Sequence, residues 1–195
     1  KKIAARAMED AGHNYVIIID EINRGNISKI FGELITLIEA DKRWGEGNQL
    51  SVTLPMGDVF AVPNNLYIIG TMNSADKSIS LVDTALRRRF AFVEMPPVEA
   101  LVQDAVLRAV MHKLNNYLHR ELRSSDLLIG HAYFIGRTAD DLAPIMNNSI
   151  IPLLYEYFYD DEAKVRKSLE CLDGTDYEIE PTPLRRVRIR RKAVP

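Results

Sequence analysis

The sequence predicts an α/β fold, a parallel sheet with flanking helices, followed by a mainly helical part. Two continuous apolar runs, at 15–19 and 66–70, have the pattern of strands buried on both faces of a parallel sheet. The pair Pro96-Pro97 marks a boundary, and helical periodicity follows it. A chain of 195 residues with 47% hydrophobic and 27% charged residues suits one globular domain or two small ones.

In the first part, strands and helices are predicted in turn. Asn26 can cap a helix with a long apolar stripe, because its side-chain oxygen can accept from the backbone of the first turn. Alternation on either side of a Pro-Met-Gly-Asp turn predicts a hairpin. The predicted elements are helix 2–11, strand 15–19, helix 27–38, hairpin 50–62, strand 66–70, helix 80–87 and strand 90–93.

The second part reads as helical, with helices at about 98–123, 140–159 and 161–171. Pro152 is expected to break or kink the second of these. Residues 174–183 are rich in turn formers. We therefore expect three sections: the α/β part at 1–95, with the hairpin inside it, a mainly helical part at 96–184 and a basic tail at 185–195.

Charge and cysteine content indicate the cellular compartment and the kinds of partner to expect. The last eleven residues hold six bases and no acid, so an overall charge of −2 combines an acidic body with a basic tail. A solvated strand or terminal extension is the preferred interpretation of the tail, and nucleic-acid contact is the alternative. Cys171 is the sole cysteine, which favours a reducing, cytoplasmic compartment. We expect no membrane partner, since no apolar run could cross a bilayer and Glu9-Asp10 interrupts any signal core.

The first candidate site is the pair of acids that follows strand 15–19. In open α/β sheets, ligands bind beyond the carboxyl ends of the strands. A carboxylate such as Asp20 can hold hydrated Mg²⁺ there, and its neighbour Glu21 can orient or deprotonate a water. Taken alone, two acids after a strand are as well explained by a solvated loop.

Two further features add to this site. Asn73 follows strand 66–70, and its amide could sense a γ-phosphate oxygen, although a lone Asn after a strand is commonly a turn residue. Arg87, Arg88 and Arg89 follow the predicted helix 80–87 and could neutralise charge on a phosphoryl group. A solvated basic turn would explain one or two of these arginines, but it does not explain the order of the three features.

That order resembles one family closely. Segment 16–26, with Asp20-Glu21-Ile22-Asn23-Arg24, resembles the Walker B segment of AAA+ proteins. Within them it is most similar to the McrB-type GTPase motor subunits of modification-dependent (5-methylcytosine) restriction systems. Segment 72–78 resembles that family's Met-Asn-Thr-Ala-Asp-Arg-Ser signature, with Ser74 and Lys77 as departures; Lys cannot reproduce the fork of Arg. Segments 86–90, 129–134 and 151–154 resemble the arginine-finger and lid segments, so the likeness covers about residues 14–161.

The resemblance implies roles for individual residues. Asp20 would bind Mg²⁺ through water, Glu21 would activate the attacking water, Asn23 would help to place it, and Asn73 would be the sensor. Arg88 and Arg89 would reach the nucleotide of the adjacent subunit in a homo-oligomeric ring, a hexamer. His131, in the lid-like segment, would approach the nucleotide, with a structural hydrogen bond as an equal alternative.

The resemblance also implies a function for the whole assembly. The family couples GTP hydrolysis to DNA translocation and is stimulated by a separate nuclease subunit. Hairpin 50–62 would lie in the region of the motor that can face partners or the central pore.

One expected motif is not in this sequence. A phosphate-binding loop needs Gly-x-x-x-x-Gly-Lys-Ser/Thr, and none of the ten glycines is followed by Lys. In AAA+ proteins that loop follows a strand placed between those predicted at 66–70 and 90–93. We therefore expect a partial P-loop NTPase (AAA+) sheet, a fragment that does not hydrolyse nucleotide by itself. An ATP-dependent AAA+ remodelling chaperone and a non-enzymatic truncated assembly module remain alternatives, and GTP is not distinguished from ATP.

Overall fold

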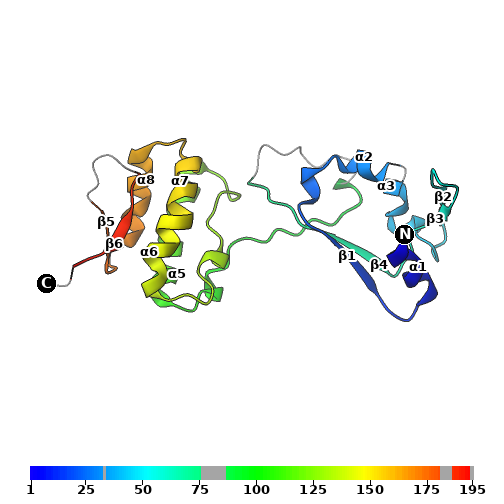
Figure 1. Cartoon of the computed structure of the whole chain (residues 1–195), viewed down its shortest axis with the longest axis horizontal. Helices are drawn as coiled ribbons and strands as arrows, with labels where there is room; N and C mark the ends of the chain where they lie inside the picture. The colour runs from blue at the N-terminus through cyan, green and yellow to red at the C-terminus, as the bar shows by residue number, and fades with distance from the viewer. Residues whose placement is uncertain (33, 76–86, 181–185, 194–195) are drawn as a thin grey trace. The chain divides into compact units, whose positions relative to one another are not determined.

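A computed structural model of the chain describes residues 1–32, 34–75, 87–180 and 186–193. The chain divides into two compact units, residues 1–93 and 94–195 (Figure 1). Each unit has its own cluster of buried apolar side chains. Among the described residues, no helix is both long enough and apolar enough to cross a membrane.

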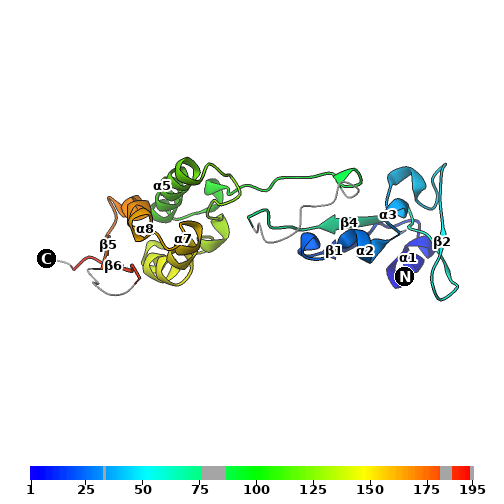
Figure 2. The ribbon, with the colours of Figure 1, turned by 90° about the horizontal axis from the view of Figure 1, so that it is seen from above.

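The first unit is built on a pair of parallel strands. β1 and β4 lie side by side in both views of the ribbon (Figures 1 and 2), in the register that pairs Ile19 with Gly70. A two-stranded antiparallel hairpin, β2–β3, precedes β4. The elements of this unit are α1 (Lys2–Glu9), β1 (Tyr15–Ile19), η1 (Ile22–Arg24), α2 (Ile27–Phe31), α3 (Leu34–Leu37), η2 (Ala40–Lys42), β2 (Val52–Thr53), β3 (Val59–Phe60) and β4 (Leu66–Gly70).

The β1–β4 pair is covered on one face. Ala4 and Ala7 of α1 and Leu37 of α3 join the buried cluster that packs against this face. On the other face Ile18 is 70% exposed and its register partner Ile69 is 51% exposed. The expectation that these strands are buried on both faces is therefore wrong for the described residues, since only one face has helices packed on it.

The sequence also predicts a helix at 80–87 and a strand at 90–93 in this unit. The expected helix 80–87 lies almost entirely outside the described residues. The strand expected at 90–93 is not formed, and Val93 is 81% exposed. A strand needs a partner for its backbone hydrogen bonds, and among the described residues this segment pairs with none.

The second unit is mainly helical. A long helix, α5 (Ala105–Leu122), begins at Asp104, whose carboxylate accepts from the N–H groups of Val106 and Leu107. Its inner face packs on the later helices through a fully buried core that includes Leu107, Met111, Leu114, Leu118, Phe134, Met146, Leu154 and Val165. The remaining helices are η3 (Glu99–Leu101), η4 (His131–Tyr133), η5 (Ala139–Asp141), α6 (Leu142–Ile145), η6 (Met146–Ile150), α7 (Ile151–Tyr157), α8 (Glu162–Ser168) and η7 (Leu169–Leu172).

Pro152 does not end the helix. A wide π-helical turn, η6, precedes it, and Ile150 and Ile151 keep right-handed helical backbone angles into α7. Because proline lacks an N–H and crowds the preceding turn, a widened turn is a recognised way to continue a helix past it. The helix is therefore not broken at Pro152, and the irregularity expected there is a π-helical turn.

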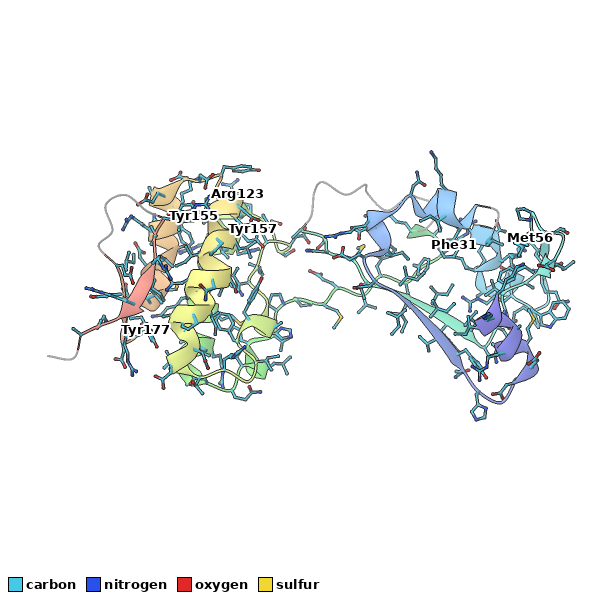
Figure 3. The ribbon with its side chains drawn as sticks, viewed as in Figure 1. Phe31, Met56, Arg123, Tyr155, Tyr157 and Tyr177 are labelled. Carbon is cyan, nitrogen blue, oxygen red and sulfur yellow. The ribbon has the colours of Figure 1, made fainter. Side chains whose placement is uncertain are left out.

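The segment expected to be turns and a basic tail contains a small sheet. β5 (Tyr177–Ile179) pairs antiparallel with β6 (Ile189–Arg191). Val187 and Ile189 are buried in the core of the unit, and the hydroxyl of Tyr155, labelled in Figure 3, accepts from Val187 N–H at 2.9 Å. Residues 186–191 are therefore part of the second unit's fold, and the predicted separate tail is wrong for this stretch.

The bases of this stretch are mostly paired within the same unit. Arg190 lies 3.0 Å from Glu178, Arg191 lies 3.0 Å from Asp140, and Arg186 lies 3.0 Å from Asp160. Exposed ion pairs of this kind stabilise a fold only slightly. They nevertheless occupy the guanidinium groups that nucleic-acid contact would need, which favours the solvated-strand interpretation.

Candidate functional site

The ends of β1 and β4 are joined by backbone hydrogen bonds that continue past the strands. Thr71 N–H donates to Ile19 O at 3.0 Å, and Ile22 N–H donates to Thr71 O at 2.8 Å. Gly70 permits the close approach, because a Cβ there would lie only 2.9 Å from Cδ1 of Ile22. The two acids after β1 and the polar segment after β4 therefore meet at one edge of the sheet, as the order of the motifs predicts.

The Thr71 hydroxyl links the two segments a second time. It donates a short hydrogen bond to Oδ1 of Asp20 and accepts from Glu21 N–H at 3.1 Å. The sequence analysis missed this residue. The one sequence feature that points to Thr71 is its place directly after the second strand. A hydroxyl residue there is also typical of an ordinary turn.

Glu21 has an unusual backbone conformation. Its φ of 53° lies in the left-handed region, and the short helix η1 begins after it. Its carboxylate Oε2 is 3.2 Å from Arg24 Nε, an ion pair that lacks the alignment of a hydrogen bond. A non-glycine residue at such an angle costs about 1 kcal/mol, so the surrounding contacts must hold it there.

Asn23 carries a buried acceptor that no described residue satisfies. Its Oδ1 atom is shielded from solvent, yet it accepts no hydrogen bond from any residue that the structure describes. A buried acceptor left unpaired costs about 1–3 kcal/mol, so a donor such as a bound water would relieve it. This atom therefore suits the water-placing role that the sequence analysis gave to Asn23.

Asn73 lies three residues beyond the end of β4 and is exposed. Its Oδ1 accepts from Ala75 N–H at 3.0 Å, which is the local turn expected of an ordinary Asn after a strand. The turn uses the oxygen, and no described residue accepts from Nδ2, whose N–H groups suit an acceptor such as a phosphate oxygen.

The three consecutive arginines have three different surroundings. Arg87 lies over the ring of Phe92, with 5.7 Å from its Cζ to the ring centroid. Arg89 forms an ion pair with Glu39 at 2.5 Å. Arg88 is exposed and forms no ion pair with a residue in the described part of the chain. Arg88 is therefore the one of the three best placed to reach another molecule.

His131 belongs to the second unit and has a structural contact there. Its Nδ1 accepts from Val98 N–H at 3.0 Å. When Nδ1 accepts, the neutral ring carries its proton on Nε2. The structural hydrogen bond expected as an alternative is thus present, and in this tautomer Nε2 carries the proton that a ligand would accept.

The donor set at the strand ends suits Mg²⁺ held mainly by water. Asp20 is exposed, and within the described part of the chain one of its two oxygens accepts a hydrogen bond, from Thr71. Among the described residues no three His, Cys, Asp or Glu side chains gather into a cage. Mg²⁺ at nucleotide sites keeps several waters and uses one or two carboxylates together with phosphates, so a single carboxylate fits it better than it fits zinc.

Both parts of this chain are similar to known proteins. Residues 1–90 match the AAA domain of the dynein-related subfamily, and residues 106–166 match the α-helical lid domain of McrB. The EcoKMcrB subunit of a type IV methyl-directed restriction enzyme from Escherichia coli (strain K12) is 39% identical over 200 residues, 87% of this chain and 42% of the relative.

A second relative is the component YdiS of the type II restriction enzyme BsuMI from Bacillus subtilis (strain 168). It is 31% identical over 101 residues, which cover 46% of this chain and 29% of that protein. This chain thus spans less than half the length of either relative. The matches confirm the predicted fold class, a partial AAA-type α/β part followed by a helical lid, and they identify an McrB-like AAA domain joined to an McrB-type lid in this chain.

Proposed function

We propose that this chain is the nucleotide-handling part of a GTP-hydrolysing motor subunit of a restriction endonuclease complex. The observation that carries the proposal is the joining of the Asp20-Glu21 pair to the Thr71–Asn73 segment at one edge of a parallel sheet. The similarity to the EcoKMcrB subunit supports the restriction context. The proposal includes the domain limits expected from the sequence, an α/β part at 1–95 and a lid from 96.

In this proposal each residue of the site has a separate role in binding the metal, activating water or contacting the phosphate. Asp20 holds Mg²⁺ through water, and the ion when bound offsets the charge on the phosphate oxygens. Glu21 takes a proton from the attacking water, which Asn23 Oδ1 helps to hold in place. Asn73 donates from Nδ2 to the γ-phosphate. His131 of the lid, as the resemblance implies, approaches the nucleotide.

The proposed assembly is a ring, a hexamer, in which Arg88 or Arg89 of one subunit reaches the nucleotide of the next. An arginine supplied by a neighbour can accelerate phosphoryl transfer by about 10³–10⁵. The exposure of Arg88 supports this role more than the paired state of Arg89 does. A nuclease subunit and DNA are the proposed partners, with GTP hydrolysis driving translocation along the DNA.

The test is nucleotide turnover by the full-length protein and by residues 1–195, with GTP and ATP each offered in the presence of Mg²⁺. We expect the full-length protein to hydrolyse GTP in preference to ATP, and residues 1–195 to hydrolyse neither, because they contain no phosphate-binding loop. ATP preference would favour a remodelling chaperone, and no turnover by either form would favour a non-enzymatic assembly module.

A further inference from the structure

Thr71 holds both acidic residues of the candidate site. Its hydroxyl contacts Asp20 through the side chain and Glu21 through the backbone, and its own backbone pairs with the residues on either side of them. We propose that Thr71 is a positioning residue that fixes the Asp20 carboxylate for hydrated Mg²⁺ and fixes the turn that carries Glu21. This inference rests on the proposed function, since it concerns the same site.

The hydrogen-bonding capacity of a hydroxyl explains why Thr suits this position. A hydroxyl has one donor and two acceptor lone pairs. The donor is used on Asp20 Oδ1, and one lone pair accepts from Glu21 N–H. Asp20 is exposed, and among the described residues this bond is the contact that orients its carboxylate; it uses Oδ1, so Oδ2 would be the oxygen that faces a metal-bound water.

The backbone conformation of Glu21 is the second reason for assigning a positioning role to Thr71. A side chain at a positive φ is strained, and such a conformation persists where neighbouring contacts impose it. Among the described residues, two hydrogen bonds tie this turn to the segment after β4, and both end on Thr71, one from Glu21 N–H to its hydroxyl and one from Ile22 N–H to its carbonyl. Loss of the hydroxyl would release one of these two bonds and leave the other.

The position of Thr71 also connects the acids to the proposed sensor. Asn73 lies two residues further along the same segment. A shift of this segment toward or away from a phosphate would therefore move the hydroxyl that holds Asp20. The structure thus offers a direct path from the sensor segment to the carboxylate proposed to hold the metal.

Two substitutions separate the hydroxyl from the shape of the side chain. Thr71→Val keeps the branched shape and removes the hydroxyl, and Thr71→Ser keeps the hydroxyl. Thr138→Val is the matched control, because Thr138 also donates to a carboxylate, Asp141 Oδ2 at 3.3 Å, and has no role in the proposed site. All are made in the full-length protein.

The measurements are GTP turnover as a function of Mg²⁺ concentration and the rise in Tm that a non-hydrolysable GTP analogue causes at each Mg²⁺ concentration. Loss of a residue that orients a metal ligand typically weakens metal affinity about 10–100-fold. We expect Thr71→Val to raise the Mg²⁺ concentration for half-maximal turnover, and for half-maximal Tm rise, by about 10-fold. Turnover at saturating Mg²⁺ is largely restored, and Thr71→Ser and Thr138→Val resemble the wild type.

The inference is overturned if Thr71→Val has the wild-type Mg²⁺ dependence, or if Thr71→Ser is as impaired as Thr71→Val, since the methyl group would then be the important feature. Asp20→Asn provides the separate test of the proposed function. If Asp20→Asn leaves the Mg²⁺ dependence unchanged, the assignment of Asp20 as the metal carboxylate fails, whatever the outcome at Thr71.

Discussion

Arg89 Nη2 lies 2.5 Å from Glu39 Oε1, and the two side chains are only 18% and 33% exposed. Glu39 follows α3, so this ion pair ties the arginine segment to the helices of the first unit. The neighbouring Arg88 is exposed. The sequence assigns Arg88 and Arg89 the same role, but in the structure Arg89 is held in an ion pair and Arg88 is exposed.

The first prediction concerns stability. Arg89→Ala leaves the partly buried carboxylate of Glu39 without its ion-pair partner, which should lower the free energy of unfolding by about 1–3 kcal/mol. Arg88→Ala removes only an exposed side chain and should change it by less than about 0.5 kcal/mol. Urea unfolding of both variants checks this, and equal losses would show that the ion pair does not distinguish them.

The second prediction concerns turnover between subunits. If Arg88 acts on the neighbouring subunit's nucleotide, Arg88→Ala should lower GTP turnover by about 10³ while nucleotide binding persists. A mixture of Arg88→Ala and Glu21→Gln subunits should recover part of the activity, because some interfaces then combine an intact Glu21 with an intact Arg88. A mixture as inactive as either variant alone would argue against a residue shared between subunits.

The third prediction concerns the attachment of β6. Asn147 Nδ2 donates to Ile189 O at 2.8 Å, and Asn147 Oδ1 accepts from Ile189 N–H at 2.8 Å. Asn147→Ala loses both bonds and leaves backbone groups unpaired, so we expect a loss of about 1–3 kcal/mol in thermal or urea unfolding. Asn148→Ala is the control, since Asn148 is exposed and should lose less than about 0.5 kcal/mol. Equal losses of stability in Asn147→Ala and Asn148→Ala would contradict a role of Asn147 in attaching β6.

The fourth prediction concerns pH. The backbone N–H of Leu107, together with those of Ala139 and Val106, lowers the pKa of Asp104 below its ordinary value of 3.8. A lowered pKa in the folded state adds stability that is present above pH 3.8 and is lost as pH falls through the folded value.

The check is the Tm of wild type and Asp104→Asn between about pH 6 and pH 3, the range that spans titration of an ordinary carboxyl. Asp104→Asn should be less stable near neutrality, because its Nδ2 cannot accept from Ala139 N–H as Asp104 Oδ2 does. Its Tm should fall less steeply toward low pH than that of the wild type. Parallel curves of Tm against pH for the wild type and Asp104→Asn would contradict a stabilising effect of the lowered Asp104 pKa.

Much of the first unit could be predicted from local pattern. β1 and β4 have the bounds that the sequence predicts, since continuous runs of β-branched and apolar residues favour a strand strongly. Segment 90–93 has a similar composition but forms no strand. A strand depends on its partner's backbone as much as on its own residues, and local composition does not report the partner.

The parts that the sequence analysis missed are the non-local ones. β5 and β6 are three residues each, and their pairing across the intervening chain has no signature in either segment alone, although Val187 and Ile189 alternate with arginines. The roles of Thr71 and Glu39 depend on partners about fifty residues away in each case. The motif positions Asp20, Glu21 and Asn73 were accessible because their order along the chain is itself the pattern.

The central claim is that Glu21 activates the water that attacks the nucleotide, and Glu21→Gln in the full-length protein tests it most directly. The amide keeps the size of the side chain but cannot accept a proton. We predict that GTP, measured by the Tm rise it causes with Mg²⁺, still binds, and that turnover falls by at least about 10², the lower range for a general base. Turnover by Glu21→Gln at the wild-type rate would contradict the account.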